Sequence, residues 1–273
     1  MKSLRTLLPA PQNRPKKAAF VIFAKLPVPG RVKTRLLSVL SPHGAAQLHN
    51  ACLADTLMLA ARHAQCSRHL YIAPPANLAA IERLPHAAAF DPRWQIRRQR
   101  GRHLGARLAA AVRELLASGA QRIVIVGTDT PWMAARRVAQ AFRALRRADV
   151  VLGPAEDGGY YLIGVRRFVP QMFKGIPWGT DRVLRRTLAA LENSGVRYAL
   201  LPGDFDLDRP ADLRRLERWH RAGKVLPPEL HQWLTNREFE RELRGRNDRG
   251  AVSESSRRRL PPRRRRIRPP GRA

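Results

Sequence analysis

Short runs of β-branched and other apolar residues recur along the chain and alternate with segments of helical periodicity. The clearest runs are Ala18–Ala24, Ile123–Val126 and Val150–Leu152, and such runs are typical of buried strands. Further strands are predicted at Leu70–Ala73, Trp94–Arg98, Tyr160–Val165 and Tyr198–Leu201. Because strands alternate with helices, the pattern predicts an α/β fold with three layers and a mostly parallel sheet.

Helical spacing of apolar residues is clearest in Gly101–Ala117, where four leucines and Val112 recur along one face. Ser41 and Pro42 have the residue types of an N-cap and a first helical position, so a helix is expected from there to about Gln65. Other helices are predicted near Asn77–Arg83, Pro131–Arg147, Asp181–Asn193, Pro210–His220 and Pro228–Leu243.

The only two cysteines, Cys52 and Cys66, both fall in the helix expected to end near Gln65. A separation of fourteen residues corresponds to about 21 Å along a helix, whereas a disulfide needs Cα atoms within about 7 Å. Their spacing also fits no metal-ligand motif. We interpret them as buried free thiols of a cytoplasmic protein.

Composition divides the 273 residues into three parts. Residues 1–17 are predicted to be a flexible leader, because they lack the apolar core of an export signal. Residues 18–222 are predicted to form the α/β domain, and 223–273 a basic, largely disordered tail. No apolar run approaches the roughly 20 residues that span a bilayer.

The formal net charge of +31 raises the question of nucleic-acid binding. Much of the excess lies at the end of the chain, where Asn236–Ala273 holds fourteen arginines against five acidic residues. No aromatic residues interleave the arginine runs, as a stacking platform would require. Compositional bias and a solvated tail are therefore the favoured reading. The alternative from another class is a basic nucleic-acid-binding protein on an inactive enzyme scaffold.

Acidic residues follow two of the predicted strands. Asp129 comes after Ile123–Val126, and the pair Glu156 and Asp157 comes after Val150–Leu152. Open α/β sheets bind ligands at the carboxyl ends of their strands. Asp129 and Asp157 could therefore share Mg²⁺ or Mn²⁺ with the phosphates of a nucleotide. The structural alternative is that Asp129 or Thr130 caps a helix that begins at Pro131.

A basic loop follows the first predicted strand. Lys25, Arg31, Lys33 and Arg35 surround Gly30, whose backbone is free to adopt a tight turn. A loop of this kind suits di- or triphosphate binding. The Walker A spacing is absent, and the alternative is an ordinary surface loop of an arginine-rich protein.

Two later segments carry weaker signals. Trp178 is placed to cover an acceptor or a base, while Thr180 or Asp181 could cap the following helix. Asp206 and Asp208 follow the last predicted strand and could complete a metal site, although Asp208 could instead cap the helix that begins at Pro210.

Five ordered segments together resemble the DUF2064 proteins, also called radical-SAM/selenodomain-associated transferase 1. These proteins are related to the phospholactate guanylyltransferases and to the wider GT-A group of nucleotidyl- and glycosyltransferases. The segments are Phe-Ala-Lys-Leu-Pro-Val-Pro-Gly-Arg-Val-Lys-Thr-Arg-Leu (23–36), Gly-Thr-Asp-Thr-Pro (127–131), Gly-Pro-Ala-Glu-Asp-Gly-Gly-Tyr-Tyr-Leu-Ile-Gly (153–164), Pro-Trp-Gly-Thr-Asp (177–181) and Asp-Leu-Asp-Arg-Pro-Ala-Asp-Leu (206–213).

The resemblance implies a GT-A, Rossmann-like fold that binds a nucleotide with a divalent metal. By position it assigns the metal and the chemistry to Asp129 and Asp157. It assigns nucleotide and phosphate binding to Lys25, Gly30, Arg31, Lys33, Arg35, Gly101 and Gly105. One departure stands in 101–107, where the family pattern Leu-Gly-Glu-Arg is changed by Ala106 and is preceded by His103.

The implied substrates are a nucleoside triphosphate or nucleotide-sugar donor and a small-molecule acceptor. Association of some members with arsenosugar biosynthesis favours a glycosyltransferase over a nucleotidyltransferase, and a radical-SAM protein is a candidate pathway partner. Neither implication identifies the acceptor.

Overall fold

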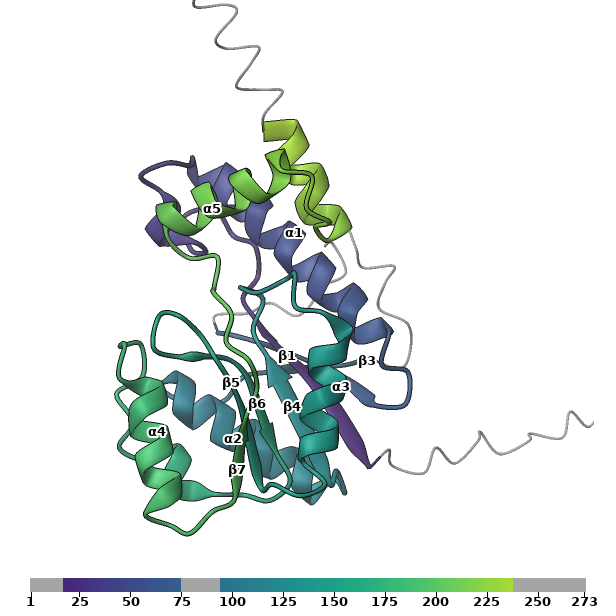
Figure 1. The fold of residues 1–273 in the computed structure, drawn as a ribbon, viewed down its shortest axis with the longest axis vertical. Helices are drawn as coiled ribbons and strands as arrows, with labels where there is room; N and C mark the ends of the chain where they lie inside the picture. The colour runs from purple at the N-terminus through teal and green to yellow at the C-terminus, as the bar shows by residue number, and fades with distance from the viewer. Residues whose placement is uncertain (1–16, 75–93, 238–273) are drawn as a thin grey trace, which may run out of the picture. The chain divides into compact units, whose positions relative to one another are not determined.

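A computed structural model describes residues 17–74 and 94–237, and these residues contain a seven-stranded sheet of order β3-β2-β1-β4-β6-β5-β7 (Figure 1). The strands are β1 (Ala18–Ala24), β2 (Ser67–Ile72), β3 (Trp94–Arg98), β4 (Arg122–Val126), β5 (Val150–Pro154), β6 (Tyr160–Val165) and β7 (Tyr198–Leu200). Within this sheet β6 alone runs antiparallel to its neighbours β4 and β5. The predicted mostly parallel α/β sheet is confirmed.

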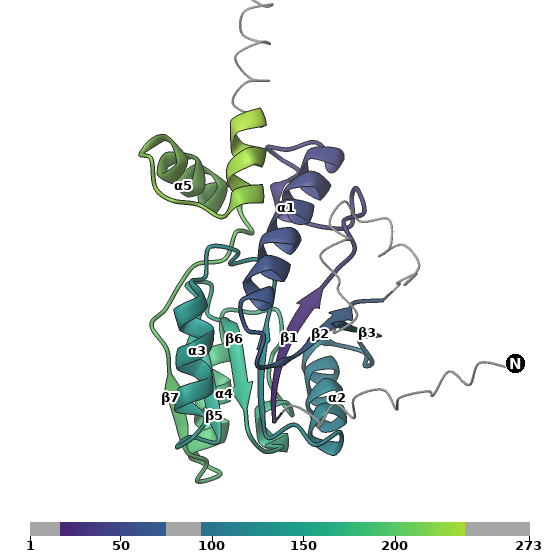
Figure 2. The ribbon, with the colours of Figure 1, turned by 90° about the vertical axis from the view of Figure 1, so that its right-hand side faces the viewer.

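Helices cover both faces of the sheet (Figures 1 and 2). On one face, Phe20 and Ile22 of β1 belong to the same apolar cluster as residues of α1 (Pro42–Ala61) and α3 (Ala135–Ala144). On the other face, Ala19 and Val21 belong to a cluster with residues of α2 (Leu104–Ala117) and α4 (Val183–Glu192). Alternate residues of one buried strand thus face opposite layers, which explains why this strand is apolar without interruption.

The remaining helix, α5 (Pro210–Arg221), follows β7, and single 3₁₀ turns occur at Thr34–Leu36 and Pro170–Met172. Beyond α5, a helical segment covers residues 228–237. Its first turn is tied to α1, because the Asp55 carboxylate accepts the backbone N–H groups of Glu229 and Leu230. Ordered structure therefore extends past the predicted boundary at 222.

Two predicted helices have different limits in the structure. The helix expected from Pro131 begins only at Ala135, because residues 131–134 form turns and extended backbone. The helix expected to reach Gln65 ends at Ala61, so Cys66 lies outside it. Both cysteines are nevertheless buried and unbridged, as predicted. The predicted helix at 77–83, residues 1–16 of the leader and residues 238–273 of the tail lie outside the described residues.

Parallel pairing brings four strand ends to one edge of the sheet. β1 pairs in parallel with β2 and with β4, and β2 pairs in parallel with β3. The loops that begin after Ala24, Ile72, Arg98 and Val126 therefore start side by side. Within the described ranges, no helix is long and apolar enough to cross a membrane.

A buried carboxylate holds the opposite end of the sheet together. Asp149, just before β5, is 5% exposed, and its side chain accepts hydrogen bonds from Arg166 at 2.9 Å and Arg167 at 3.3 Å. Burial alone would raise the pKa of Asp149, but the hydrogen bonds and charges of Arg167 and Arg166 hold it below the usual value. This carboxylate thus stabilises the fold above its unfolded-state pKa, and the contribution is lost as the pH falls through the folded-state pKa.

Replacing Asp149 tests this arrangement. Asp149→Asn is expected to lower the free energy of unfolding at pH 7 by about 1–3 kcal/mol, because the arginine donors lose their charged acceptor. Thermal denaturation followed by circular dichroism gives the Tm of each protein. The Tm difference between wild type and variant is expected to narrow as the pH falls below the unfolded-state pKa of the carboxyl group, because the stabilisation by the charged form is lost there progressively.

Glu192→Gln is the matched control. The Glu192 side chain accepts only an exposed hydrogen bond from the Tyr198 hydroxyl among the described residues, so its loss is expected to change Tm little. Equal Tm losses in the two variants would contradict a specific role for Asp149.

Candidate nucleotide site

A cavity of about 700 Å³ opens along the sheet edge where the parallel strands end. Its wall is formed by residues from the loops after β1, β3 and β4, from the β5–β6 turn and from the segments before α4 and α5. Eight residues predicted from the sequence line it: Lys25, Lys33, Arg35, Asp129, Asp157, Trp178, Asp206 and Asp208. Segments that are far apart in the sequence thus meet at one site.

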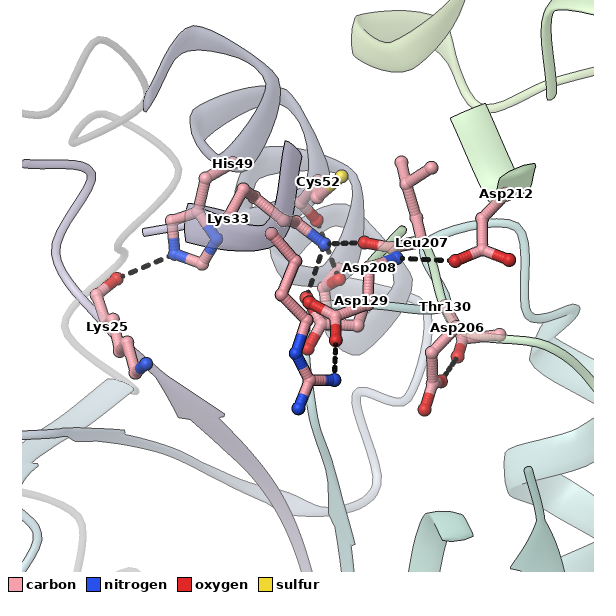
Figure 3. Close-up of polar contacts among 12 residues, drawn as sticks. Lys25, Lys33, His49, Cys52, Asp129, Thr130, Asp206, Leu207, Asp208 and Asp212 are labelled. Carbon is pink, nitrogen blue, oxygen red and sulfur yellow. Dashed lines mark hydrogen bonds and ion pairs between the residues drawn. The ribbon is translucent and has the colours of Figure 1, made fainter. Parts of the chain in front are cut away.

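The centre of the site is an ion pair between Lys33 and Asp129 (Figure 3). Lys33 Nζ lies 2.5 Å from Asp129 Oδ1, and it also donates to the backbone carbonyl of Leu207. The Lys33 side chain is 2% exposed, whereas the Asp129 side chain is 47% exposed. One ammonium therefore ties the loop after β1 to the loop after β4 and to the segment before α5.

Charge pairing explains the protonation states of this pair. Burial opposes the charged form of both groups, but the Asp129 carboxylate holds the pKa of Lys33 above its usual value. The Lys33 ammonium in turn holds the pKa of Asp129 below its usual value, despite the cost of burial. Both groups remain charged at neutral pH, and Asp129 keeps an anionic side chain at the cavity.

Asp206 is the second carboxylate of the site, and its environment is different. The Thr130 hydroxyl donates to Asp206 Oδ1 at 2.6 Å (Figure 3). Burial raises the pKa of Asp206 to about 7, and the nearby charges of Asp129 and Asp157 add to the rise. Since the three acidic side chains influence one another, the cavity concentrates negative charge that a cation would relieve.

Asp208 forms an ion pair and does not cap α5. Arg35 Nη1 lies 2.6 Å from Asp208 Oδ2, while Asp212 accepts the backbone N–H groups of Asp208 and Arg209. The helix-capping alternative for Asp208 is therefore wrong. The corresponding alternative for Asp129 or Thr130 is also wrong, because α3 begins at Ala135 and its N-cap is Ala134.

Neighbouring carboxylates in the β5–β6 turn have separate positions. Asp157 lines the cavity, and its Oδ1 accepts the backbone N–H of Gly159 at 2.8 Å. Glu156 lies outside the cavity wall, and both of its carboxylate oxygens accept hydrogen bonds from Arg215 of α5. Only Asp157 of this pair is placed to meet a ligand in the cavity.

Four more predicted binding residues do not line the cavity: Gly30, Arg31, Gly101 and Gly105. A Cβ atom at Gly105 would stand 2.0 Å from the Trp178 indole nitrogen, and one at Gly101 would stand 2.8 Å from the backbone of Ala106. The absence of a side chain at these two positions is accounted for by packing. Trp178 itself lines the cavity and contacts Tyr160 edge-to-face.

The departure from the family pattern at His103 also has a structural role. His103 is the N-cap of α2, and its Nδ1 accepts the backbone N–H of Ala106 at 3.3 Å. An imidazole here performs the task usually given to serine or aspartate.

The cavity also includes residues to which the sequence analysis gave no binding role: His49, Gln99, Arg107, Thr130 and Arg209. Gln99 directly follows β3, so the rule that drew attention to Asp129 at the end of β4 would have found it. His49 lies within α1, and its ring contacts the Lys25 carbonyl at 3.0 Å. Burial, followed by the Lys33 charge, lowers its pKa, so the imidazole is neutral at pH 7.

The carboxylates of the site supply only part of the ligand set that a metal ion needs. Among the described residues, no three His, Cys, Asp or Glu side chains are grouped so that they alone could hold an ion. Mg²⁺ in nucleotide sites is usually bound through one or two carboxylates together with substrate phosphates. The anionic Asp129 and the nearby Asp206 match that smaller donor set.

Comparisons with known proteins identify relatives of this chain. The model of the DUF2064 family, described as an uncharacterized protein conserved in bacteria, matches residues 56–180. A phosphoenolpyruvate guanylyltransferase from Chloroflexus aggregans is 31% identical over 189 residues, which cover 67% of this chain and 89% of that protein.

Solved structures share the fold. A protein from Desulfovibrio desulfuricans G20, described as a nucleotide-diphospho-sugar transferase, is 30% identical with a TM-score of 0.74, covering 82% of this chain and 96% of that one. The 4-diphosphocytidyl-2C-methyl-D-erythritol synthase of Anaerococcus prevotii is 8% identical with a TM-score of 0.51, covering 75% of this chain and 97% of that one. The second likeness concerns the fold alone.

The predicted transferase is therefore confirmed. With 31% identity over 89% of a curated relative and a matching family model, the chain belongs to the DUF2064 family and is a transferase with a nucleotide-diphospho-sugar transferase fold.

Proposed function

We propose that this protein is a metal-dependent nucleotidyltransferase that uses a nucleoside triphosphate and a small-molecule acceptor. The observation that carries the proposal is the meeting of Asp129, Asp157 and Asp206 on one cavity, beside the basic side chains of Lys25 and Arg209. Acidic groups that bind a cation and basic groups that bind phosphate are both needed for phosphoryl chemistry. The similarity to a guanylyltransferase favours a nucleotidyltransferase over a nucleotide-sugar glycosyltransferase, which is the second candidate.

In the proposed reaction an acceptor oxygen attacks the α-phosphorus of the triphosphate. The new oxygen–phosphorus bond forms as the bond to the pyrophosphate oxygen breaks, so pyrophosphate leaves with the electron pair. Catalysis then depends on positioning and charge stabilisation. Lys33 holds Asp129 in place, and Lys25 and Arg209 line the cavity as candidate phosphate contacts.

Asp129 and Asp206 are the residues that would hold Mg²⁺ or Mn²⁺, with Asp157 as a further acidic neighbour. A divalent cation bound there would neutralise charge on the phosphates. Asp206 is suited to this role because burial and the charges of Asp129 and Asp157 raise its pKa to about 7, and a bound cation would offset both effects. The phosphates supply the ligands that the protein lacks.

A nucleotide-sugar glycosyltransferase is the second candidate. The Desulfovibrio desulfuricans structure that resembles this chain is described as a nucleotide-diphospho-sugar transferase, and Trp178 offers an aromatic wall beside Asp157. Under this candidate the acceptor belongs to arsenosugar or related small-molecule biosynthesis, with a radical-SAM enzyme in the same pathway. Under both candidates we place the protein in the cytoplasm, a compartment that suits two buried cysteines without a disulfide bond.

Product analysis separates the two candidates. The protein is incubated with Mg²⁺ and either nucleoside triphosphates or nucleotide sugars, with phosphoenolpyruvate among the acceptors, and phosphorus NMR identifies the products. Pyrophosphate formed only with an acceptor supports the first candidate, and a nucleoside diphosphate released from a nucleotide sugar supports the second. No turnover and no nucleotide binding would overturn both.

Substitution of a carboxylate that lines the cavity is expected to lower activity more than substitution of a carboxylate outside it. Asp129→Asn is expected to lower kcat/KM on the order of 10²–10³-fold, because charge stabilisation in the transition state is lost. Asp157→Asn is expected to lower it less, since no ammonium fixes this side chain. Steady-state assays of pyrophosphate release provide the measurement.

Glu156→Gln is the control for these variants. It removes a carboxylate next to Asp157 in sequence, but one that contacts Arg215 outside the cavity. Activity close to wild type is expected. Equal losses in Asp157→Asn and Glu156→Gln would show that general destabilisation, and not the cavity charge, explains the effect.

Asp206 is expected to lower the stability of the metal-free protein. An acid whose folded-state pKa is raised to about 7 costs stability when the pH exceeds its unfolded-state pKa, and the cost is complete above the folded-state value. Asp206→Asn should therefore raise the Tm in EDTA at pH 8 by a few degrees, with a smaller gain at pH 5. The same variant should lose activity.

Asp208→Asn serves as the comparison, because the Asp208 carboxylate forms an ion pair with the exposed Arg35. Its Tm in EDTA should stay level or fall. A fall in the Tm of Asp206→Asn at pH 8 would contradict the electrostatic account of this site.

A further inference from the structure

We propose that the stacked rings of Trp132 and Phe205, joined through Asp204, position the two carboxylates assigned to the metal, Asp129 and Asp206. The inference rests on the proposed function and identifies positioning residues for the same site. None of the three lines the cavity, so they act through their neighbours in the chain and not by contact with the nucleotide.

Both carboxylates stand on irregular backbone. Asp129 lies in residues 127–134, between β4 and α3, and Asp206 lies in residues 201–209, between β7 and α5. A single isolated bridge, between Ala155 and Asp204, is the regular pairing of these two segments. Side chains on loops are held less accurately than those on helices or strands. The separation of the two carboxylates therefore depends on contacts between the segments that carry them.

The two segments lie against each other and run in opposite directions. The backbone N–H of Leu207 donates to the Asp129 carbonyl at 2.8 Å. One residue further along, the Thr130 hydroxyl donates to Asp206 Oδ1 at 2.6 Å (Figure 3). Position 129 thus pairs with 207 and position 130 with 206, which places both carboxylates on one row of contacts.

The aromatic pair closes this row. The ring centroids of Trp132 and Phe205 are 4.4 Å apart and the ring planes differ by 28°, which is a stacked arrangement. The indole Nε1–H of Trp132 donates to Asp204 Oδ1 at 3.0 Å. Phe205 is 2% exposed, so water has little access to the stack. Trp132 is therefore held, by its ring and by its N–H, to the two residues that directly precede Asp206.

Asp204 connects the pair to the sheet. Its Oδ1 also accepts the backbone N–H of Phe205 at 2.9 Å. Its own backbone N–H donates to the carbonyl of Pro154, the last residue of β5, and its carbonyl accepts the backbone N–H of Glu156, both at 3.0 Å. The bond from Glu156 uses the main chain, so Glu156→Gln leaves it in place. Main-chain bonds thus locate Asp204, and its carboxylate extends that location to Trp132.

Trp219 of α5 packs edge-on against both rings of the pair. Its ring centroid lies 5.7 Å from that of Trp132 and 5.1 Å from that of Phe205, at interplanar angles of 78° and 81°. Aromatic side chains have only two torsions, so a packed trio of rings resists displacement. Loss of one ring is expected to let the loops shift, and loss of groups that orient metal ligands typically lowers metal affinity by roughly 10- to 100-fold.

Phe205→Leu removes the stack and keeps an apolar side chain. Mn²⁺ binding at 25 °C is followed by the loss of its free-ion EPR signal, with the α,β-methylene analogues of GTP, ATP, CTP and UTP tested in turn. With the analogue that binds best to the wild type, the Kd for Mn²⁺ is expected to rise roughly 10- to 100-fold in Phe205→Leu. The reason is that Asp129 and Asp206 are no longer held at a fixed separation.

Phe173→Leu is the matched control, because it makes the same change in another stacked pair. Phe173 is 6% exposed, its ring centroid lies 5.8 Å from that of Phe168, and neither residue lines the cavity. Both variants should lower the Tm, but Phe173→Leu should keep the wild-type Kd for Mn²⁺. Wild-type affinity in Phe205→Leu, or equal weakening in the two variants, would overturn the positioning role.

Two variants of the less buried Trp132 make the same test if Phe205→Leu does not fold. Trp132→Phe retains a ring that can stack, whereas Trp132→Leu does not. Trp132→Leu is expected to weaken Mn²⁺ binding as Phe205→Leu does, and Trp132→Phe should retain most of the wild-type affinity. Wild-type affinity in Trp132→Leu would contradict the proposal.

The outcomes separate this inference from the proposed function. Tight joint binding of Mn²⁺ and an analogue that persists in Phe205→Leu and Trp132→Leu would overturn the positioning role alone, and the metal-dependent nucleotidyltransferase would stand. Failure of Mn²⁺ to bind the wild-type protein with any of the four analogues would overturn both.

Discussion

The Lys33–Asp129 ion pair is the interaction on which the rest of the site depends. The Lys33 ammonium is almost completely buried, so without the half-exposed Asp129 carboxylate it would be a desolvated, unpaired charge. Lys33 reaches this place from a backbone in the left-handed region, at φ 48°, which is uncommon for a residue with a long side chain. The second bond, to the Leu207 carbonyl, draws the segment that carries Asp206 and Asp208 into the same cluster.

Parallel strand pairing explains why such a cluster can form from distant parts of the sequence. Each parallel strand delivers the loop that follows it to the same edge, and helices on both faces keep the strands buried. The edge thus combines a basic loop after β1, an acidic loop after β4 and a polar side chain after β3. Stability and function are divided in space, since the buried Asp149 cluster lies beyond the opposite end of β5.

Much of the fold could be predicted because the central strands are buried on both faces and read as apolar runs. Ala18–Ala24 and Tyr160–Val165 have the predicted limits in the structure, and so does the less buried edge strand Trp94–Arg98. The helix limits near Pro131 and Gln65 were wrong for a local reason. The residue types near both limits are compatible with a helix, so the sequence gives no stop signal. In the structure the chain turns after Pro131, where Trp132 donates a hydrogen bond to Asp204, and it turns after Ala61 before β2 begins at Ser67.

The site was less accessible to sequence reasoning than the fold. Asp129 and Lys33 were found by their place after strands, yet the bond between them joins residues 96 positions apart. Glu156 and Asp157 are neighbours in sequence and chemically alike, but only three-dimensional packing separates the cavity from Arg215. Gln99 belongs to no motif, and only its place directly after β3 could have pointed to the cavity, where its amide contacts carbonyls of two other strands.

The most direct test of this account is whether a divalent cation and a nucleotide bind together at Asp129. Mn²⁺ binding can be followed by the loss of its free-ion EPR signal, with and without a non-hydrolysable nucleoside triphosphate analogue. The account predicts weak binding of Mn²⁺ alone, much tighter binding in the presence of the analogue, and loss of the tight binding in Asp129→Asn. Equal binding of the analogue in Mn²⁺ and in EDTA, or undiminished Mn²⁺ binding by Asp129→Asn, would contradict it.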